Sequence, residues 1–511
     1  MSRTKLGVKN SQVALLFYVI EMFLGFISRK VFIDYIGIDV LGLNTTANNL
    51  LQFLNLAELG IGSAIAFTLY KPLAQNDEKT IKEVIQVQGW LYKKIAIFVA
   101  FGAIILMFFF PLIFKKSDLP LWYAYASFGV LLYSSLLTYF VNYKQIVLSA
   151  SQQEYKITLS YKSTLVIKNI VQILAMSFFT HGYVWWLALQ FLFASLASVN
   201  LNIVIKKSFP FLDDVDTNVG TLVKDKYKNV ITKVKQLFFH KIAGYILNQT
   251  SYLIIYAFTS LAMVAIYGNY MLIVASMTML LQSVFNSVSA GVGDLIAQGD
   301  RKHILEVFKE LFTSRFFCVT VSVFCLYKLI DPFIILWVGN EYLLDNSVLI
   351  VILFIMYINL MRSVVDNFIF GYGLFRDIWA PIVESVLNIS LSILFGYLWG
   401  ITGILLGVLA SLLLIVFLWK PYFLFKYGMG QKCSIYIKMY LIHIIAFLIS
   451  AILSNHILSY VHISPSGYFE WILLACVTLG VFSIMQFSIL YLSTEGMKSF
   501  VARCLYVIRN R

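Results

Sequence analysis

The sequence is poor in charged residues, in proline and in cysteine. Asp, Glu, Lys and Arg make up 13% of the 511 residues, whereas soluble domains average about 25%. Hydrophobic residues make up 60%, and the mean hydropathy is +0.83. A soluble protein is therefore excluded. The apolar stretches are continuous rather than alternating, which argues against a β-barrel. We predict an all-α protein that crosses a membrane many times.

The motifs of several enzyme classes are absent as well. The sequence contains no G-x-x-x-x-G-K-[ST] loop for ATP hydrolysis and no H-E-x-x-H zinc motif. The five cysteines form no C-x-x-C pair, and most lie in or beside apolar runs. This placement predicts small core residues rather than redox or metal chemistry. We therefore predict no catalytic residues, no metal and no bound cofactor.

The apolar runs predict 14 transmembrane helices. A bilayer core takes about 20 apolar residues per helix, and runs of this length follow one another along almost the whole chain. One run is too long for a straight crossing, which predicts a tilted or protruding helix over 263–297. The predicted spans are 11–36, 41–70, 92–114, 120–143, 160–180, 183–205, 236–260, 263–297, 308–330, 346–371, 378–399, 401–425, 435–457 and 468–492.

The positions of the cations set the orientation of these helices. Nearly all of the 39 Lys and Arg residues fall in alternate loops and at the two ends of the chain. The opposite loops hold only Lys115, Lys116 and Lys328. Because Lys and Arg are enriched on the cytoplasmic side of membrane proteins, we predict an even number of helices with both termini in the cytoplasm. This distribution also accounts for the net charge of +14 without nucleic acid as a partner.

A polar interval divides the predicted helices into a group of six and a group of eight. We predict an N-lobe over 1–205, a cytoplasmic linker over 206–235, a C-lobe over 236–425, and two extra helices with a basic cytoplasmic tail over 426–511. The linker contains an amphipathic piece. A second amphipathic stretch, 76–94, is predicted to lie on the cytoplasmic membrane surface, where its cations meet anionic headgroups.

Four cations lie deeper within the predicted spans, namely Arg29, Lys30, Lys168 and Arg362. An ionised group at the bilayer centre costs at least about 2.5–3.5 kcal/mol on insertion scales. Lys30 and Arg362 each have an acid four residues further on, so a salt bridge along the helix is one interpretation for them. Lys168 and Arg29 have no acid at that spacing. We interpret all four as lining a water-filled cavity that attracts an anion such as a diphosphate.

Acids and amides also recur at helical spacing within the spans, which predicts polar stripes on one face of several helices. Hydrogen bonding between helices is one explanation, and a wet cavity is the other. The acids predicted to carry a coupling ion or to release the cavity cations are Glu58, Asp294, Asp366 and Glu384. The amide side chains predicted to line the cavity are Asn48, Gln52, Asn55, Gln172 and Asn388.

Short segments in the predicted helices resemble those of a known family. In the first half they are RKVFIDYIG (29–37), LGLN (41–44), LAELGIG (56–62) and LYKPL (69–73). In the second half they are IYGNY (266–270), PFIILWVG (332–339), GYGLFRD (371–377), APIVE (380–384), GITGILLG (400–407) and WKP (419–421). Their order and placement resemble the bacterial polysaccharide-repeat-unit flippases, a branch of the multidrug/oligosaccharidyl-lipid/polysaccharide exporter (MOP) superfamily. The resemblance covers roughly residues 11–425 and weakens after them.

The resemblance implies two six-helix lobes around a central cavity, with two further helices at the C-terminus. It implies a protein of the bacterial cytoplasmic (inner) membrane that serves O-antigen or capsule synthesis. Its substrate would be an undecaprenyl-diphosphate-linked oligosaccharide, moved from the cytoplasmic to the periplasmic leaflet by alternating access. Protons or sodium ions would drive the movement. Membrane lipids, a polysaccharide polymerase and chain-length machinery are the implied partners.

Single residues can be compared with the pattern of the family. Arg29 resembles its arginine in helix 1, and Glu58 resembles the acid of its E-L-G motif. Two departures concern the coupling acid. The segment NQTS (248–251) ends in serine where relatives often have an acid, and the segment GDL carries Asp294 where asparagine is commoner. Because of these departures, Asp294 and Asp366 are the candidates for the coupling residue.

Two other functions remain open from the sequence. A multidrug or organic-cation exporter of the same superfamily would need an acidic cavity, and acids outnumber cations within the predicted spans. A membrane-embedded polysaccharide polymerase or acyltransferase would need a sizeable outer loop that carries charged residues. No outer loop is long, and the predicted loop at 331–345 holds few acids. The sequence therefore favours a transporter over an enzyme.

Overall fold

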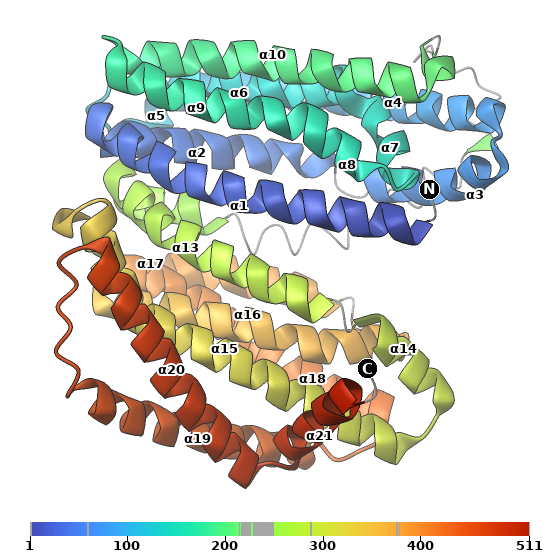
Figure 1. The fold of residues 1–511 in the computed structure, drawn as a ribbon. Coiled ribbons are helices and arrows are strands. Elements are labelled where there is room, and N and C mark those ends of the chain that lie inside the picture. The colour runs from blue at the N-terminus through green and yellow to red at the C-terminus, as the bar shows by residue number, and fades with distance from the viewer. Residues whose placement is uncertain are drawn as a thin grey trace. The chain divides into compact units, whose positions relative to one another are not determined.

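The protein is built from helices alone in the part of the chain that the structure describes. The structure is a computed structural model, and it describes residues 3–58, 61–213, 215, 226–227, 250–286, 289–374, 377 and 379–509. Every regular element in these ranges is a helix (Figure 1). The predicted all-α fold class is confirmed.

The chain folds as two compact units, Met1–Ala265 and Ile266–Arg511. Helix α13 (Leu261–Asn286) begins in the first unit and continues into the second. Most of the predicted linker, 206–235, lies outside the described residues. One described pair from this interval contacts α4, because the Tyr227 hydroxyl donates a hydrogen bond to Glu83 Oε2 at 2.9 Å and Lys226 forms an ion pair with the same carboxylate.

The first unit is a bundle in which α9 lies between α1 and α10, while α6 packs against α2, α4 and α10 (Figure 1). Its buried centre is rich in aromatic side chains, including Phe110, Phe128 and Tyr139. The helices of this unit are α1 (Arg3–Tyr35), α2 (Ile38–Leu54), α3 (Ile61–Gln75), α4 (Glu78–Phe108), α5 (Phe110–Ile113), α6 (Trp122–Phe140), α7 (Ile146–Ala150), α8 (Glu154–Ile157), α9 (Ser163–Phe178) and α10 (Gly182–Ser208).

Two predicted segments of this unit have different bounds in the structure. The span predicted over 41–70 is broken, because α2 ends at Leu54, a 3-10 turn follows over Asn55–Glu58, and α3 begins at Ile61. Glycines at 60 and 62, which have low helix propensity, accompany this break. The amphipathic stretch predicted over 76–94 is not a separate element, since it forms the first half of α4.

Helix α4 begins with a side-chain cap that explains its start. The Asp77 carboxylate accepts hydrogen bonds from the Thr80 backbone N–H at 3.0 Å and from the Thr80 hydroxyl at 2.5 Å. Such a cap satisfies one of the N–H groups that the first turn leaves without a partner. The same hydrogen bonds lower the pKa of Asp77. The short connection between α3 and α4 therefore ends at a defined residue.

The second unit is organised around α15, which packs against α16, α20 and α21. The long run predicted over 263–297 is divided between α13 and α14. The helices of this unit beyond α13 are α14 (Ser289–Gln298), α15 (Arg301–Trp337), α16 (Asn346–Gly371), α17 (Trp379–Leu412), α18 (Lys420–Phe423), α19 (Ser434–Leu458), α20 (Tyr468–Ser493) and α21 (Glu495–Arg509). Two π-helical turns, Leu413–Trp419 and Leu424–Met429, flank α18.

Helix α17 is a hairpin of two helical segments that meet at residue 400. Gly400 has φ +58°, a left-handed conformation that favours glycine, and it lies at the break predicted between the spans 378–399 and 401–425. The two segments then approach closely. A Cβ on Gly403 would lie 1.9 Å from the carbonyl oxygen of Phe395, and one on Gly407 would lie 2.3 Å from the backbone nitrogen of Ser392. Glycine at both positions allows this backbone contact.

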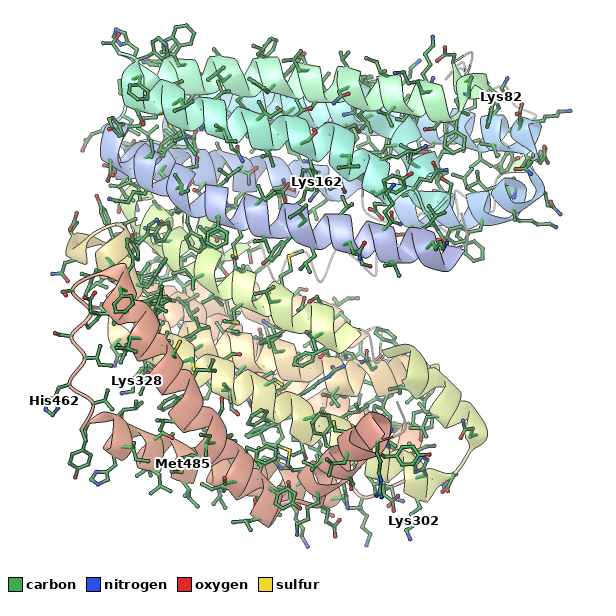
Figure 2. The ribbon with its side chains drawn as sticks, in the orientation of Figure 1. Lys82, Lys162, Lys302, Lys328, His462 and Met485 are labelled. Carbon is green, nitrogen blue, oxygen red and sulfur yellow. The ribbon has the colours of Figure 1, made fainter. Side chains whose placement is uncertain are left out.

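Nine helices within the described residues are long and apolar enough to cross a membrane, or ten if α6 and the segment bent from it by 59° count as one span. The chain is thus a multi-pass membrane protein, and the count of 14 stays a prediction. Lys302 and Lys328 lie toward opposite ends of α15 (Figure 2). This placement agrees with the cation distribution in the sequence, which assigns these two lysines to opposite sides of the membrane.

We expect Gly407→Ala to lower the thermal unfolding temperature of the purified protein, because the added methyl group meets backbone atoms that cannot move aside. Overpacking of this kind costs about 1–3 kcal/mol. Gly480→Ala is the matched control, since a Cβ on this α20 glycine meets no atom within 4 Å. Differential scanning fluorimetry in detergent measures both variants. Equal unfolding temperatures for the two would show that the α17 segments do not approach as described.

Candidate functional site

The polar stripe of α9 faces α10. The Lys168 ammonium donates a hydrogen bond to Gln190 Oε1 at 2.7 Å, and the Gln172 amide, one turn further on, donates to the Trp186 carbonyl at 2.9 Å. Gln172 is buried, whereas Lys168 is half-buried. Within the described residues Lys168 forms no ion pair with a carboxylate. Its partner is a neutral amide, so no carboxylate of the described residues compensates the charge of this side chain.

Two predicted cavity cations lie on α1. The Arg29 guanidinium donates a hydrogen bond to the carbonyl oxygen of Ala265 at 2.8 Å, across 236 residues of sequence. This contact ties α1 to the first turns of α13, within the first unit. Lys30 instead pairs with Asp34 on its own helix at 3.0 Å, and both side chains are about two-fifths exposed, at 40% and 42%. Lys30 is therefore neutralised locally, as its spacing from Asp34 predicts.

The polar residues of α2 and of the 3-10 turn after it are only partly engaged by neighbouring helices. Asn55 Oδ1 accepts hydrogen bonds from Ser135 and Tyr139 of α6, each at 3.0 Å. Glu58 Oε1 accepts one from the Tyr92 hydroxyl of α4 at 2.9 Å. Asn48 is exposed and Gln52 half-buried, and neither has a side-chain hydrogen bond among the residues described.

Four charged side chains of the second unit form one chain of ion pairs. Arg362 of α16 contacts Asp366 Oδ2 at 3.0 Å and Glu384 Oε1 of α17 at 3.1 Å. Lys420 of α18 contacts the other oxygen of Asp366 at 2.6 Å. The order Glu384, Arg362, Asp366, Lys420 alternates acid and base, so the four charges compensate one another. We call these residues the four-charge chain.

Burial makes the four-charge chain energetically important. The Glu384 side chain is fully buried, and the exposed fractions of Lys420, Asp366 and Arg362 are 10%, 19% and 24%. Removal of one member of a buried pair is destabilising by roughly 3–5 kcal/mol, because it leaves the other charge uncompensated. Arg362 is the only member that contacts Glu384 among the described residues.

Two buried side chains beside the four-charge chain have unused hydrogen-bonding capacity. Glu384 Oε2 has no hydrogen-bond partner within the described part of the chain, and neither has the amide oxygen or nitrogen of Asn388. Asn388 is fully buried and follows Glu384 by one helical turn on α17. Buried polar atoms without partners are rare and call for an explanation such as an ion or a proton. Carboxylate and amide oxygens are suitable ligands for a hard cation.

The structure places the remaining candidates and adds residues that the sequence did not single out. Asp294 belongs to α14, and its side chain lies outside the described residues. The added residues are Lys420, Gln190 and Tyr92, none of which belongs to a predicted polar stripe. Each of these three residues forms a hydrogen bond with a residue at least 22 positions away in the sequence. Helical periodicity along one segment therefore cannot predict these contacts. The residues described contain no cluster of His, Cys, Asp and Glu that could hold a metal ion.

Arg315 of α15 is a further buried cation that the sequence pattern did not single out. It is 4% exposed and donates hydrogen bonds to the Ser363 hydroxyl and, at 3.1 Å, to the carbonyl oxygen of Phe285. Its guanidinium also lies over the Phe285 ring, 4.9 Å from the ring centre. Arg315 thus joins the end of α13 to α16, next to Arg362.

No protein-family model matches the sequence, and no curated protein matches it. Solved structures do share the fold. The lipid II flippase MurJ, in an inward closed conformation, matches with a TM-score of 0.67 and 15% identity over 95% of this chain and 99% of that chain. A multidrug resistance MATE transporter of the MOP superfamily, in an inward-facing conformation, matches with a TM-score of 0.57 and 12% identity over 78% of this chain and 93% of that chain. The chain has the fold of these membrane transporters.

A double-mutant cycle tests the four-charge chain. We expect Arg362→Met to destabilise the protein by about 3–5 kcal/mol, because Glu384 loses its partner while Asp366 keeps Lys420 at 2.6 Å. Adding Glu384→Met should recover most of this loss, since no uncompensated buried charge remains. Chemical or thermal unfolding of the purified single and double variants provides the measurement. Strictly additive effects would contradict the pairing.

Proposed function

We propose that this chain, which has the fold of a lipid II flippase, moves lipid-linked oligosaccharides across the bacterial cytoplasmic membrane. The proposed substrate is an undecaprenyl-diphosphate-linked repeat unit for O-antigen or capsule. It passes from the cytoplasmic to the periplasmic leaflet, driven by a gradient of protons or sodium ions. Both chain termini face the cytoplasm in this proposal. The support comes from the fold, from the charges inside the spans and from the resemblance in sequence.

The observation that carries the proposal is the environment of Lys168. A diphosphate carries negative charge into the low-dielectric interior only if cations meet it there. Lys168 contacts a neutral amide oxygen at 2.7 Å and no carboxylate among the described residues, so its charge is available to an anion. Arg29 donates to a backbone carbonyl, which is also neutral. Arg362 differs, because two acids already compensate it.

We assign the coupling ion to the buried acid of the second unit. Glu384 offers an unused carboxylate oxygen beside the Asn388 amide, and both are fully buried. A proton on Glu384, or a sodium ion held between the carboxylate and amide oxygens, would use this capacity. Binding of either species would compete with Arg362 for the charge of Glu384 and so perturb the four-charge chain. Asp366, Glu58 and Asp294 are the other acids that can take part.

Alternating access requires parts that move as separate bodies. The chain contains two compact units, Met1–Ala265 and Ile266–Arg511, as rocking of one bundle against another requires. A polysaccharide polymerase and chain-length machinery are the partners we propose, since they consume the product in the outer leaflet. The lipid tail of the substrate stays in the bilayer during transfer.

Replacement of Lys168 or Arg29 should abolish polymer export. We expect Lys168→Met and Arg29→Ala to eliminate surface polysaccharide in cells that depend on this chain, while protein levels stay normal. Lys168→Met should not lower stability, because it removes a charge that is costly to bury. Lys162→Met, six residues earlier and paired with Glu21 at the surface, is the control that should retain export. Immunoblots for the chain and gel analysis of the polysaccharide give the two readouts.

Each rival function predicts a different result in the same strains. Wild-type polymer from both variants would refute the anion-binding role. Resistance to cationic dyes on expression, with no effect on polymer, would indicate a drug exporter instead. Activity on lipid-linked substrate in detergent, where no sealed membrane exists, would indicate an enzyme such as a polymerase.

The coupling proposal has its own test in sealed proteoliposomes. We expect transport of a lipid-linked oligosaccharide by the wild-type protein to accelerate several-fold when an inward proton or sodium gradient is imposed. Glu384→Gln should remove this acceleration but leave slow, gradient-independent transfer. Glu21→Gln is the control, because Glu21 lies in a half-exposed surface pair. An unchanged gradient response in Glu384→Gln would assign coupling to another acid.

A further inference from the structure

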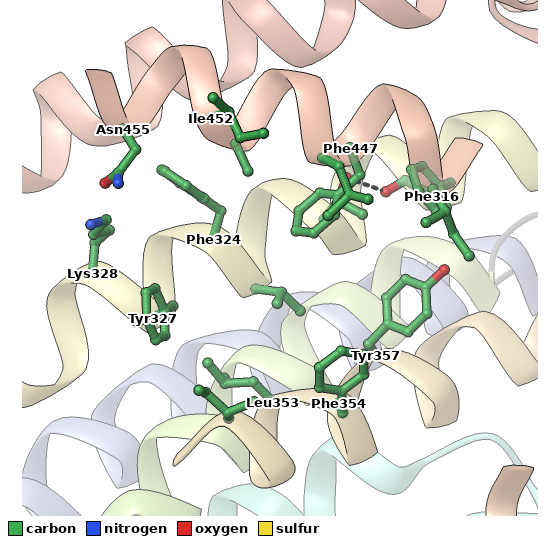
Figure 3. Close-up of a pocket in the computed structure, with 16 residues that line it drawn as sticks. Phe316, Phe324, Tyr327, Lys328, Leu353, Phe354, Tyr357, Phe447, Ile452 and Asn455 are labelled. Carbon is green, nitrogen blue, oxygen red and sulfur yellow. Dashed lines mark hydrogen bonds between the residues drawn. The ribbon is translucent and has the colours of Figure 1, made fainter. Parts of the chain in front are cut away.

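A mostly apolar cavity of about 510 Å³ lies within the second unit between α15, α16 and α19 (Figure 3). Cavities that hold a small organic ligand span about 300–1,000 Å³, so this one has room for a guest. Its walls are mainly aromatic and aliphatic, and they include Phe324, Phe354, Phe447 and Leu448. None of these side chains belongs to the four-charge chain or contacts it in any hydrogen bond or ion pair among the residues described.

The lysine and the asparagine that line the cavity lie at one end of it. Figure 3 shows Lys328 and Asn455 close together there, while Tyr357 lies toward the opposite end. Asn455 is three residues before the end of α19, which corresponds to about 4.5 Å of helix rise. Lys328 lies toward the C-terminal end of α15. The cation distribution in the sequence predicts that this end faces away from the cytoplasm. The polar end is therefore near the outer membrane–water boundary.

Lys328 supplies an uncompensated positive charge at this end. It is half-buried, and no carboxylate forms an ion pair with it within the described ranges. Its ammonium contacts the face of the neighbouring Tyr327 ring at 5.7 Å from the centre. An apolar cavity with one cation at its mouth is complementary to an amphiphile that has an anionic head and a hydrocarbon tail.

The size of the cavity distinguishes between two such amphiphiles. One acyl chain of a phospholipid fits a space of about 510 Å³. An undecaprenyl chain is several times longer and would leave most of its length outside. Both carry phosphate, so the charge of Lys328 does not separate them, whereas the volume favours the phospholipid.

We propose that this cavity binds one acyl chain of an anionic membrane phospholipid, with the phosphate held by Lys328 and Asn455. Such a lipid would fill the space between α19 and the α15–α16 pair. The site is separate from the transport function proposed above and does not depend on it. Because lipid tails are as apolar as these helices, the tail gains little free energy by leaving the bilayer. Selection therefore rests on the headgroup and on Lys328.

Native mass spectrometry of the purified full chain tests this proposal. Phosphatidylglycerol, phosphatidylethanolamine and undecaprenyl phosphate are added in equal amounts, and the bound species are counted. We expect one phosphatidylglycerol per chain in preference to the other two lipids. Lys328→Gln should weaken phosphatidylglycerol binding about fivefold, the effect of one basic residue near a membrane surface, and weaken phosphatidylethanolamine binding less, because the ammonium of that headgroup offsets the charge of its phosphate.

Two further variants separate the site from general effects. Ala451→Phe places a ring into the cavity and should reduce the binding of every lipid. Lys115→Gln removes an exposed cation of the first unit and should change nothing. If Ala451→Phe does not fold, Lys328→Gln still decides the question. Equal binding of phosphatidylglycerol and phosphatidylethanolamine, an equal loss in Lys115→Gln, or a preference for undecaprenyl phosphate would each overturn the proposal.

Discussion

A charged group inside the hydrocarbon of a membrane persists only where another group meets it, and this constraint organises the interior of both units. The cost of an isolated charge at the bilayer centre is at least about 2.5–3.5 kcal/mol, which is a large share of the stability of most domains. Glu384, fully buried, is met by Arg362 at 3.1 Å. Lys168 is met by an amide oxygen and Arg29 by a backbone carbonyl. Each charge therefore has a defined contact that also ties helices together.

The two units satisfy this constraint in different ways. In the second unit, acid and base alternate along the four-charge chain, so the cluster is neutral as a whole. In the first unit, Lys168 meets a neutral amide oxygen, and no carboxylate of the described residues compensates it. In the proposed function, an anionic substrate would interact most favourably with Lys168. A coupling cation would interact most favourably with the unused oxygen of Glu384. These contacts are the reason that we propose anion binding for the first unit and ion coupling for the second.

Irregular backbone marks the places where helices of this fold can change direction. Helix α17 turns back at Gly400, and its segments pack tightly through Gly403 and Gly407. α2 gives way to a 3-10 turn at Asn55–Glu58. Polar side chains lie at these places, because freed backbone groups and neighbouring helices supply partners there. Gly403 and Gly407 allow the two segments of this hairpin to lie in close backbone contact.

The sequence by itself determined the fold class, the membrane location and the contacts that are local in the chain. The cation distribution and the long apolar runs required a multi-pass helical protein, and a spacing of four residues predicted the pairs Lys30–Asp34 and Arg362–Asp366. Helical periodicity identified which face of α9 is polar, but it did not identify the partner on α10. Contacts between distant residues, such as Lys420 with Asp366 across 54 positions, were decided by the tertiary structure. The physical reason is that periodicity reports one helix at a time, whereas the choice of partner depends on which helices the packing brings together.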